Sequence, residues 1–159
     1  MGEEAGLVRP RFARGCRCFA VMINGSIAGY GWLSTAPEWI GELQLEISPN
    51  PGEAYIWNCV TVAEHRRKGV FRSLLGRIAG TANAEGTRRL WIGSVAIPAE
   101  KAVAASGFRP AMRFTAFGAA GMHFVRVAAA KEDALGAEAQ RVLQVKPGFY
   151  LRRSRRRRH

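Results

Sequence analysis

The chain has 159 residues, which is enough for one domain with a substantial core. Hydrophobic residues make up 48% of it and charged residues 23%, a composition typical of globular and not of disordered proteins. No apolar run approaches the roughly 20 residues of a membrane-spanning helix. The acidic start, Met1-Gly2-Glu3-Glu4, is not followed by the apolar segment of a signal peptide. We therefore expect a cytoplasmic protein that does not bind membranes.

Half of the formal net charge of +12 comes from the C-terminus, where six arginines lie between Arg152 and Arg158. Runs of like charge repel themselves and favour disorder, so residues 151–159 are predicted to form an Arg-rich disordered tail. Such a tail binds acidic partners, RNA among them, electrostatically. No recognition motif with interleaved aromatic residues accompanies it, and we expect nucleic-acid binding only through the tail.

The three cysteines are Cys16, Cys18 and Cys59. An odd number in a chain without a signal peptide argues against a disulfide framework. Three thiols could also ligate a metal, but Cys16 and Cys18 would share one face of an extended segment, as buried reduced residues of a strand do. We predict reduced cysteines and no metal site.

Residues 1–15 are predicted to be a partial N-terminal lead-in, in which residues 11–15 form the last turn of a helix that ends at Gly15. A β-hairpin follows, because two strand-like runs flank Asn24-Gly25, a pair suited to a type I′ turn. The expected strands are residues 16–23, 26–34, 42–47, 54–62, 89–95, 108–117 and 122–128. The expected helices are residues 70–82, 98–106 and 131–145. A strand–helix–strand centre with antiparallel flanks predicts an α/β (α+β) domain over residues 16–150, with a central mixed sheet flanked by helices.

The segment of residues 59–71, CVTVAEHRRKGVF, puts a basic loop with a glycine between a strand and a helix. The first N–H groups of a helix lack backbone partners and attract phosphate. Gly69 would let an anion approach the main chain, and Arg67, Lys68 and Arg72 would add positive charge. The spacing differs from that of a P-loop and of the dinucleotide fingerprint. From the residues alone, an anion-binding loop and an ordinary basic turn both remain open.

Residues 66–71, RRKGVF, resemble the acyl-CoA signature Gln/Arg-x-x-Gly-x-Gly/Ala of the GCN5-related N-acetyltransferase (GNAT) family. The strand before the loop, the long helix after it and the later pair Gly107-Phe108 also resemble this family, over about residues 16–128. The resemblance implies a GNAT-like acyl-CoA N-acyltransferase fold. It also implies direct transfer of an acetyl group from acetyl-CoA to a small-molecule or protein amine in a ternary complex.

The resemblance further implies which residues hold the cosubstrate. The backbone of residues 60–62 would lie along pantetheine where two parallel strands separate, and the amides of residues 67–71 would hold the pyrophosphate. Phe71 replaces the usual small residue, and its side chain can face the core because the ligand contacts the main chain. The expected CoA-binding residues are Val60, Thr61, Val62, Arg66, Arg67, Lys68, Gly69, Val70, Phe71 and Arg72.

The resemblance is incomplete at the catalytic positions. The tyrosine that often protonates the CoA thiolate in the family is replaced by Val103. The family often places a glutamate base on the central strand, and the glutamates here are Glu53 at the start of that strand and Glu64 beyond its end. Asn58 lies in the middle of the strand but does not ionise, and Glu53 and Asn58 are the expected catalytic residues. His65 is read as a surface residue of the phosphate loop. A catalytically degenerate acyl-CoA-binding GNAT domain and a basic RNA or ribosome interaction module therefore remain as alternatives.

The N-terminal part is also shorter than in the family, whose members place a strand and one or two helices before the first hairpin. Residues 1–15 leave most of the acceptor wall missing, as expected for a truncated frame, a minimal version, or a homodimer in which a second subunit completes the domain. Trp57 and Trp91 are expected in the core, whereas Trp32 and Trp39 lie closer to the expected acceptor site.

Overall fold

The structure, a computed structural model, describes residues 2–94, 97–119, 122–130 and 134–153. The chain forms two compact units, one of residues 1–38 and 48–108 and the other of residues 39–47 and 109–159. This division falls within residues 16–150, which were predicted as one domain. Within the described ranges, no helix is long and apolar enough to cross a membrane.

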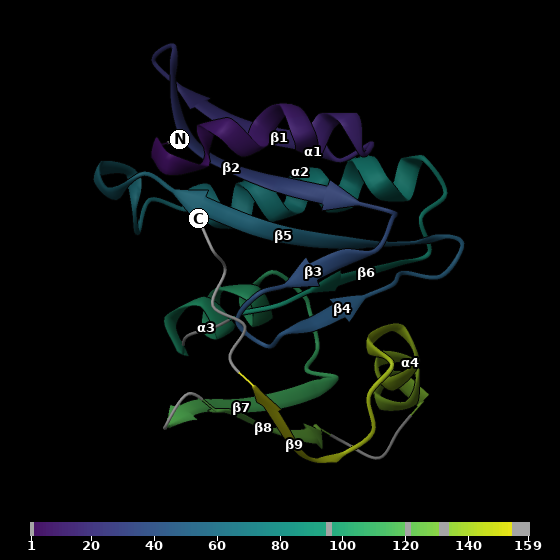
Figure 1. Ribbon diagram of the computed structural model, residues 1–159. Helices are drawn as coiled ribbons and strands as arrows, with labels where there is room; N and C mark the ends of the chain where they lie inside the picture. The colour runs from purple at the N-terminus through teal and green to yellow at the C-terminus, as the bar shows by residue number, and fades with distance from the viewer. Residues whose placement is uncertain (1, 95–96, 120–121, 131–133, 154–159) are drawn as a thin grey trace. The chain divides into compact units, whose positions relative to one another are not determined.

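A four-stranded mixed sheet forms the centre of the first unit (Figure 1). It consists of β1 (Arg17–Ile23), β2 (Ser26–Ser34), β5 (Glu53–Thr61) and β6 (Arg89–Ile92), in the order β1-β2-β5-β6. The β1–β2 and β2–β5 pairs are antiparallel, whereas β5 and β6 are parallel. Asn24 (φ 50°) and Gly25 (φ 78°) both have positive φ in the β1–β2 turn, which confirms the predicted hairpin.

Helices cover both faces of this sheet, as Figure 1 shows for α1 and α2. The helices of the unit are η1 (Gly2–Leu7), α1 (Val8–Ala13), η2 (Ala63–His65), α2 (Val70–Ala84) and α3 (Ile97–Ala105). The apolar side of α2 packs Leu74 and Ile78 against Leu33 and Ile56. The neighbouring Trp32 points to the opposite face, where it packs with residues of α1. The mixed sheet flanked by helices confirms the predicted fold class.

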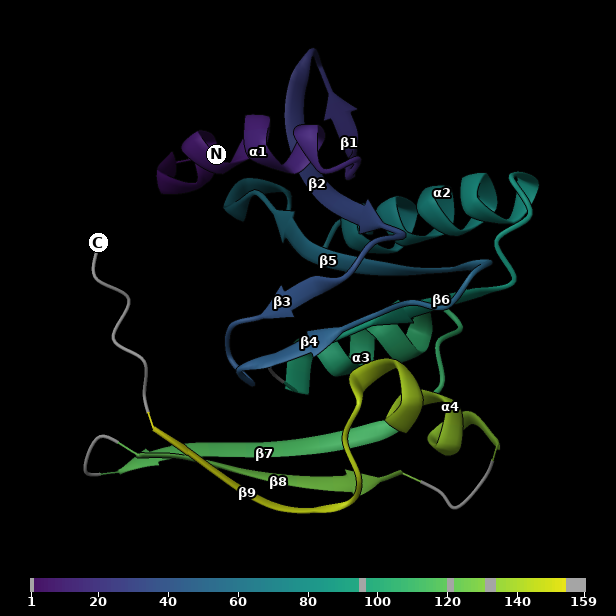
Figure 2. The same cartoon turned by 45° about the vertical axis from the view of Figure 1, so that its right-hand side comes forward.

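The second unit contains an antiparallel sheet in the order β7-β8-β9 (Figure 2). Its strands are β7 (Met112–Ala119), β8 (Met122–Ala129) and β9 (Gly148–Arg153), and its helix is α4 (Ala134–Leu143). Strand β3 (Glu38–Ile40) pairs with β4 (Leu45–Ile47), and α4 contacts β4 and β7. Val125 and Val127 of β8 are buried, as are Ala139 and Val142 of α4.

Several predicted boundaries were wrong. Of the predicted strand 42–47, only the last three residues are extended, because the chain turns at Gly41–Gln44 and Gln44 has φ 50°. Strand β6 ends at Ile92, β7 begins at Met112, and the helix predicted over 131–145 spans Ala134–Leu143, with residues 131–133 outside the described part.

Two strands were not predicted. The three residues of β3 are too few to show a period of two, and β9 follows the Pro147-Gly148 turn into the basic C-terminal run. Residues 151–153 were predicted to begin the disordered tail, but they belong to β9 and pair with β8. The rest of the predicted tail, residues 154–159, lies outside the described residues.

Candidate functional site

The parallel strands β5 and β6 pair over only part of their length. Their register runs from Glu53–Arg89 to Ile56–Ile92, where β6 ends. Strand β5 continues for five more residues, to Thr61. The β6-facing edge of β5 from Trp57 to Thr61 therefore lies beyond this parallel pairing. The family resemblance implies that the pantetheine arm would lie along this edge of β5.

A bulge at Asn58 reshapes the same half of β5. Tyr30 pairs with Val60 but Trp32 pairs with Trp57, so that Gly31 alone faces two residues of β5. Asn58 takes φ 45°, a left-handed conformation that asparagine tolerates better than most residues. Bulges re-aim side chains and occur often beside active sites. The candidate catalytic residue Asn58 thus sits at the point where β5 changes direction.

The loop between β5 and α2 turns twice through left-handed backbone. Arg67 has φ 61°, and Gly69, directly before α2, has φ 79°. The N–H of Ser73 donates to the Gly69 carbonyl at 2.9 Å, which begins the hydrogen-bond ladder of α2. The N–H groups of Val70, Phe71 and Arg72 precede that bond, so the helix itself does not use them.

The surroundings of these N–H groups are open and basic. Arg66, Arg67, Lys68 and Gly69 are exposed, and a Cβ built on Gly69 meets no heavy atom within 4 Å. The Arg66 Nε donates to the Thr61 carbonyl at 3.4 Å and so links the loop to the end of β5. Main-chain donors at a helix N-terminus, next to exposed cationic side chains, form an anion-binding arrangement.

The remaining residues of the expected CoA set have structural contacts. Val70 is buried against β2 and β5, since a Cβ on Gly29 would lie 2.8 Å from Val70 Cγ1 and 2.9 Å from the Val60 carbonyl. Phe71 packs against the core, in the direction that the sequence predicted. The Val62 N–H donates to the Ala28 carbonyl at 2.9 Å, and the Val62 carbonyl accepts from the His65 N–H at 2.9 Å, so both main-chain groups of Val62 have partners within the chain.

Arg72 differs from the expectation that it adds charge around an anion. Its Nη2 donates to the Ala105 carbonyl at 3.0 Å, at the end of α3. The guanidinium thus links α2 to α3 instead of pointing to the loop.

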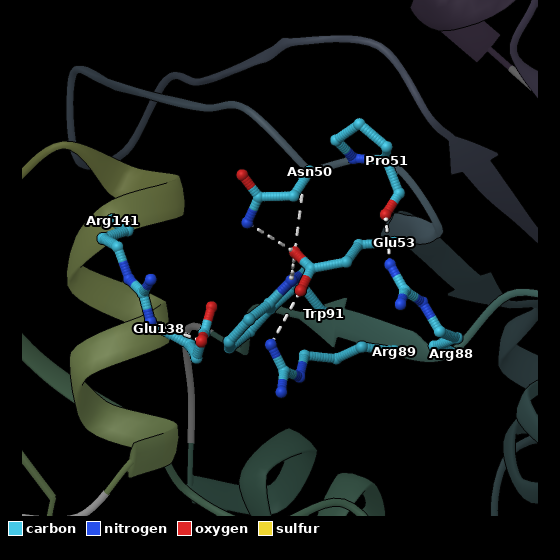
Figure 3. A network of polar contacts seen from close by, with 8 residues as sticks. All are labelled: Asn50, Pro51, Glu53, Arg88, Arg89, Trp91, Glu138 and Arg141. Carbon is cyan, nitrogen blue, oxygen red and sulfur yellow. Dashed lines mark hydrogen bonds and ion pairs between the residues drawn. The ribbon is translucent and has the colours of Figure 1, made fainter.

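The carboxylate of Glu53 is the centre of a polar network (Figure 3). Its Oε1 accepts from Arg89 Nη1 at 2.7 Å, and its Oε2 accepts from Trp91 Nε1 at 2.9 Å. The backbone N–H and the side-chain Nδ2 of Asn50 also donate to Oε2, at 3.3 and 3.2 Å. Glu53 is buried, and these bonds join the first residue of β5 to β6 and to the preceding turn.

This network works against Glu53 as a general base. Burial alone would raise the pKa of Glu53, but the bonds from Trp91 and Asn50 and the positive charge of Arg89 outweigh it and hold the pKa below its ordinary value. A carboxylate with a lowered pKa is a weaker base at neutral pH. The contacts therefore indicate that Glu53 braces β5, β6 and the turn at Asn50.

Cys59 and Val103 offer neither a nucleophile nor a general acid, whereas His65 is placed differently from the expectation. Burial raises the pKa of the Cys59 thiol to about 12, so it is not ionised at neutral pH. Val103 packs against the core beside α2, which agrees with the absence of a general acid at this position. His65 was read as a surface residue, but it is half-buried. Its Nδ1 is buried and has no hydrogen-bond partner among the described residues.

Two side-chain clusters of the first unit were not predicted from the sequence. Glu38 accepts from Arg14 at 3.1 Å and from the Cys16 thiol at 3.0 Å, and burial, followed by the contact with Glu38, raises the pKa of Cys16. On the face that α1 covers, the buried Arg11 guanidinium lies 4.5 Å from the ring of Trp57 and 5.1 Å from that of Trp32. Both clusters join residues far apart in the chain.

A cavity of about 270 Å³ lies at the beginning of β5, not at the loop. Its lining residues are Thr35, Pro49, Asn50, Pro51, Gly52, Glu53, Glu85, Gly86 and Thr87. None of them belongs to residues 57–72, so this cavity is separate from the second half of β5 and from the basic loop.

Comparison with known proteins agrees with this geometry. The model of the Acetyltransferase (GNAT) family matches residues 3–107. Among solved structures, the chain is similar to one titled "Putative acetyltransferase" from Agrobacterium tumefaciens str. C58, with 22% identity over 75% of this chain and 79% of that chain, and a TM-score of 0.53. It is also similar to an N-acetyltransferase from Staphylococcus aureus Mu50, with 20% identity over 70% of this chain and 64% of that chain, and a TM-score of 0.53. No curated protein sequence matches significantly.

The solved structures, at this level of identity, support the fold alone. The family model is the stronger finding, because it covers most of the chain and includes the whole segment from β5 through the basic loop to α3. It confirms the family resemblance of residues 66–71. The chain belongs to the acetyltransferase (GNAT) family.

Proposed function

We propose that the chain is an acyl-CoA-dependent N-acyltransferase that transfers an acetyl group from acetyl-CoA to a small-molecule or protein amine. The observation that carries this proposal is the loop of residues 66–69 at the start of α2. Left-handed backbone at Arg67 and Gly69 is followed by N–H groups that the helix does not use. A pyrophosphate is the part of CoA that such a site recognises.

The cosubstrate would follow the second half of β5. The amides of residues 67–71 would donate to the pyrophosphate, and Arg66, Arg67 and Lys68 would add positive charge around it. Pantetheine would lie in the gap beyond the β5–β6 pairing, along the backbone of residues 60–62. The thioester would then lie toward the Asn58 bulge, where the strand is distorted.

The reaction would be a direct displacement. The amine nitrogen forms a bond to the thioester carbonyl carbon, the C–S bond then breaks, and the sulfur leaves with its electron pair as the CoA thiolate. The proton lost by the amine goes to solvent, from which the thiolate is protonated. Holding both substrates in one complex supplies much of the acceleration, and backbone donors near Val60 and Thr61 would polarise the carbonyl.

A catalytically degenerate acyl-CoA-binding domain is the second candidate. It is favoured by two observations: Val103 stands at the usual acid position, and the Glu53 carboxylate is occupied by hydrogen bonds. Both candidates use the same loop and bind the same cosubstrate, and they differ only in whether the bound thioester reacts.

Calorimetric titration of the full chain with CoA and with acetyl-CoA tests both candidates together. Micromolar binding is expected, whereas no binding up to millimolar concentrations would refute both. Incubation with acetyl-CoA and a panel of polyamines, aminoglycosides and N-terminal peptides, followed by thiol detection of released CoA, then separates them. Amine-dependent release supports the transferase, and tight binding without release with any amine supports the degenerate domain.

A further inference from the structure

The β7–β9 sheet of the second unit has one buried face and one exposed face. Val125 and Val127 of β8 point to the buried face, with 2% and 3% of their surface exposed. Residues that alternate with them, Phe124 and Arg126, therefore point the other way. In the register of the sheet, Phe124 lies between Phe117 of β7 and Leu151 of β9, whereas Arg126 lies between Thr115 and Phe149.

We name this exposed side the aromatic face and define it by Phe117, Phe124, Arg126, Phe149 and Leu151. Three of its apolar side chains are unusually open: Phe149 is 84% exposed, Phe117 is 58% exposed and Leu151 is 56% exposed. The rings of Phe117 and Phe124 are stacked, with centroids 4.9 Å apart and planes 8° apart. Large apolar side chains clustered on a surface mark a binding site more often than scattered ones do.

The charge of this sheet is entirely positive. The guanidinium of Arg126 lies over the ring of Phe149, 5.8 Å from its centroid. None of the three strands contains an aspartate or a glutamate in its sequence. Arg113 is four residues before Phe117 on β7, so the two lie on the same face of the strand. Strand β9 runs directly into the Arg-rich C-terminal sequence. Aromatic rings beside cations on an open sheet suit a partner with flat rings and negative charge.

We propose that the aromatic face binds single-stranded nucleic acid. Aromatic side chains on a sheet stack on unpaired bases, and nearby cations pair with the phosphates, which gives binding with little sequence preference. One base would extend the stack of Phe117 and Phe124, and another would stack on Phe149, with Arg126 beside the backbone. A duplex does not fit this chemistry, because its bases are already stacked on each other.

This site differs from nucleic-acid binding through the C-terminal tail, which was the only such mode that the sequence predicted. The aromatic residues escaped notice because Phe117, Phe124 and Phe149 belong to three different strands and come together only through the β7–β8 and β8–β9 registers. The proposal rests on these strands and is independent of acyl-CoA binding.

Fluorescence anisotropy tests the proposal with the full chain at about 50 mM salt. The probes are a labelled 15-nucleotide RNA of mixed sequence, the DNA of the same sequence, and the RNA duplex. Both single strands are expected to bind more tightly than the duplex. Phe117→Ala and Phe149→Ala should each weaken single-strand binding about fivefold or more, since one stacked base is lost, whereas Phe149→Trp should retain it.

Met22→Ala is the matched control, because Met22 is 55% exposed but lies on β1 in the other unit. It should leave binding unchanged. Deletion of residues 154–159 should weaken single-strand binding and reduce its dependence on salt. Adding Phe149→Ala to the deleted chain should weaken the remaining binding further. Circular dichroism verifies that each variant is folded.

Four results would overturn the proposal. Single strands that do not bind at low salt would refute it outright. If deletion of the tail abolished RNA binding while Phe117→Ala and Phe149→Ala left the affinity unchanged, the binding would belong to the tail alone. Equal affinity for the duplex would show a purely electrostatic interaction. Sedimentation that finds a dimer, dissociated by Phe149→Ala and unable to bind RNA, would show that a second copy covers the face.

Discussion

Replacement of Gly69 by alanine tests the proposed pyrophosphate site at a single methyl group. Gly69 has φ 79° and ψ 0°, and it is the residue directly before α2. An added Cβ meets no protein atom within 4 Å, so the variant is free of internal clashes. We expect the methyl group to enter the space through which a pyrophosphate approaches the N–H groups of the loop.

Gly86 provides a matched control for the cost of backbone strain. It has φ 85°, it follows the other end of α2, and a Cβ there also meets nothing within 4 Å. Alanine in a left-handed conformation costs about 1–2 kcal/mol. Both variants should therefore lose about that much free energy of unfolding. Only Gly69→Ala should also lose a hydrogen bond to a charged phosphate, which contributes about 1.5–3 kcal/mol and corresponds to at least about tenfold weaker CoA binding.

Urea unfolding measures the stability of the two variants, and calorimetric titration measures their affinity for CoA. The expected pattern is equal loss of stability with weaker CoA binding in Gly69→Ala alone. If Gly69→Ala bound CoA as tightly as the unmodified chain, the pyrophosphate would not lie against this loop. Equal weakening in both variants would mean that general destabilisation, not the loop, lowers the affinity.

Two further predictions concern stability. Glu53→Gln should lower the free energy of unfolding by about 1–3 kcal/mol at neutral pH, because Arg89 and Trp91 lose a charged acceptor. Since the folded-state pKa of Glu53 is lowered, its contribution to the free energy of unfolding is fully present above the unfolded-state pKa. That contribution is lost as the pH falls through the folded-state pKa. The two chains should therefore converge in urea unfolding at acidic pH, and a constant difference would exclude an ionic origin. Gly31→Ala should destabilise by about 1–3 kcal/mol, as its Cβ would lie 2.7 Å from Cys59 Sγ. Gly76→Ala, with open space in α2, should not lower the melting temperature, and equal effects would contradict the predicted clash.

The features that the sequence predicted well are local ones. Asn24-Gly25 sets the hairpin turn through its own backbone preferences. The apolar spacing of Leu74, Leu75 and Ile78 predicts the buried side of that helix, because 3.6 residues per turn fix which side chains share a face. Each of these signals is complete within about ten residues.

The features that sequence reading missed depend on partners far along the chain. The bulge at Asn58 appears only when β5 is aligned with β2, since Gly31 must face two residues at once. No residue near Glu38 in the sequence indicates that it will be buried, because its hydrogen-bond partners Arg14 and Cys16 lie more than 20 positions away. Neither a short period nor a motif encodes these contacts, because they arise from pairing between elements.

The structure places the two buried carboxylates of the first unit where they stabilise the fold more than they aid proton transfer. The buried carboxylates among the described residues are Glu38 and Glu53, and both accept hydrogen bonds from cationic or neutral donors. Burial raises the pKa of the Cys59 thiol to about 12, so this thiol does not accept a proton from the amine at neutral pH either. With neither of these carboxylates available as a base, the proposed acyl transfer would rely on positioning and on an amine that reaches the site already deprotonated. Because such an enzyme adds little basicity of its own, it would favour acceptors of low pKa over strongly basic ones, and the choice of acceptor would be made by amine chemistry as well as by shape.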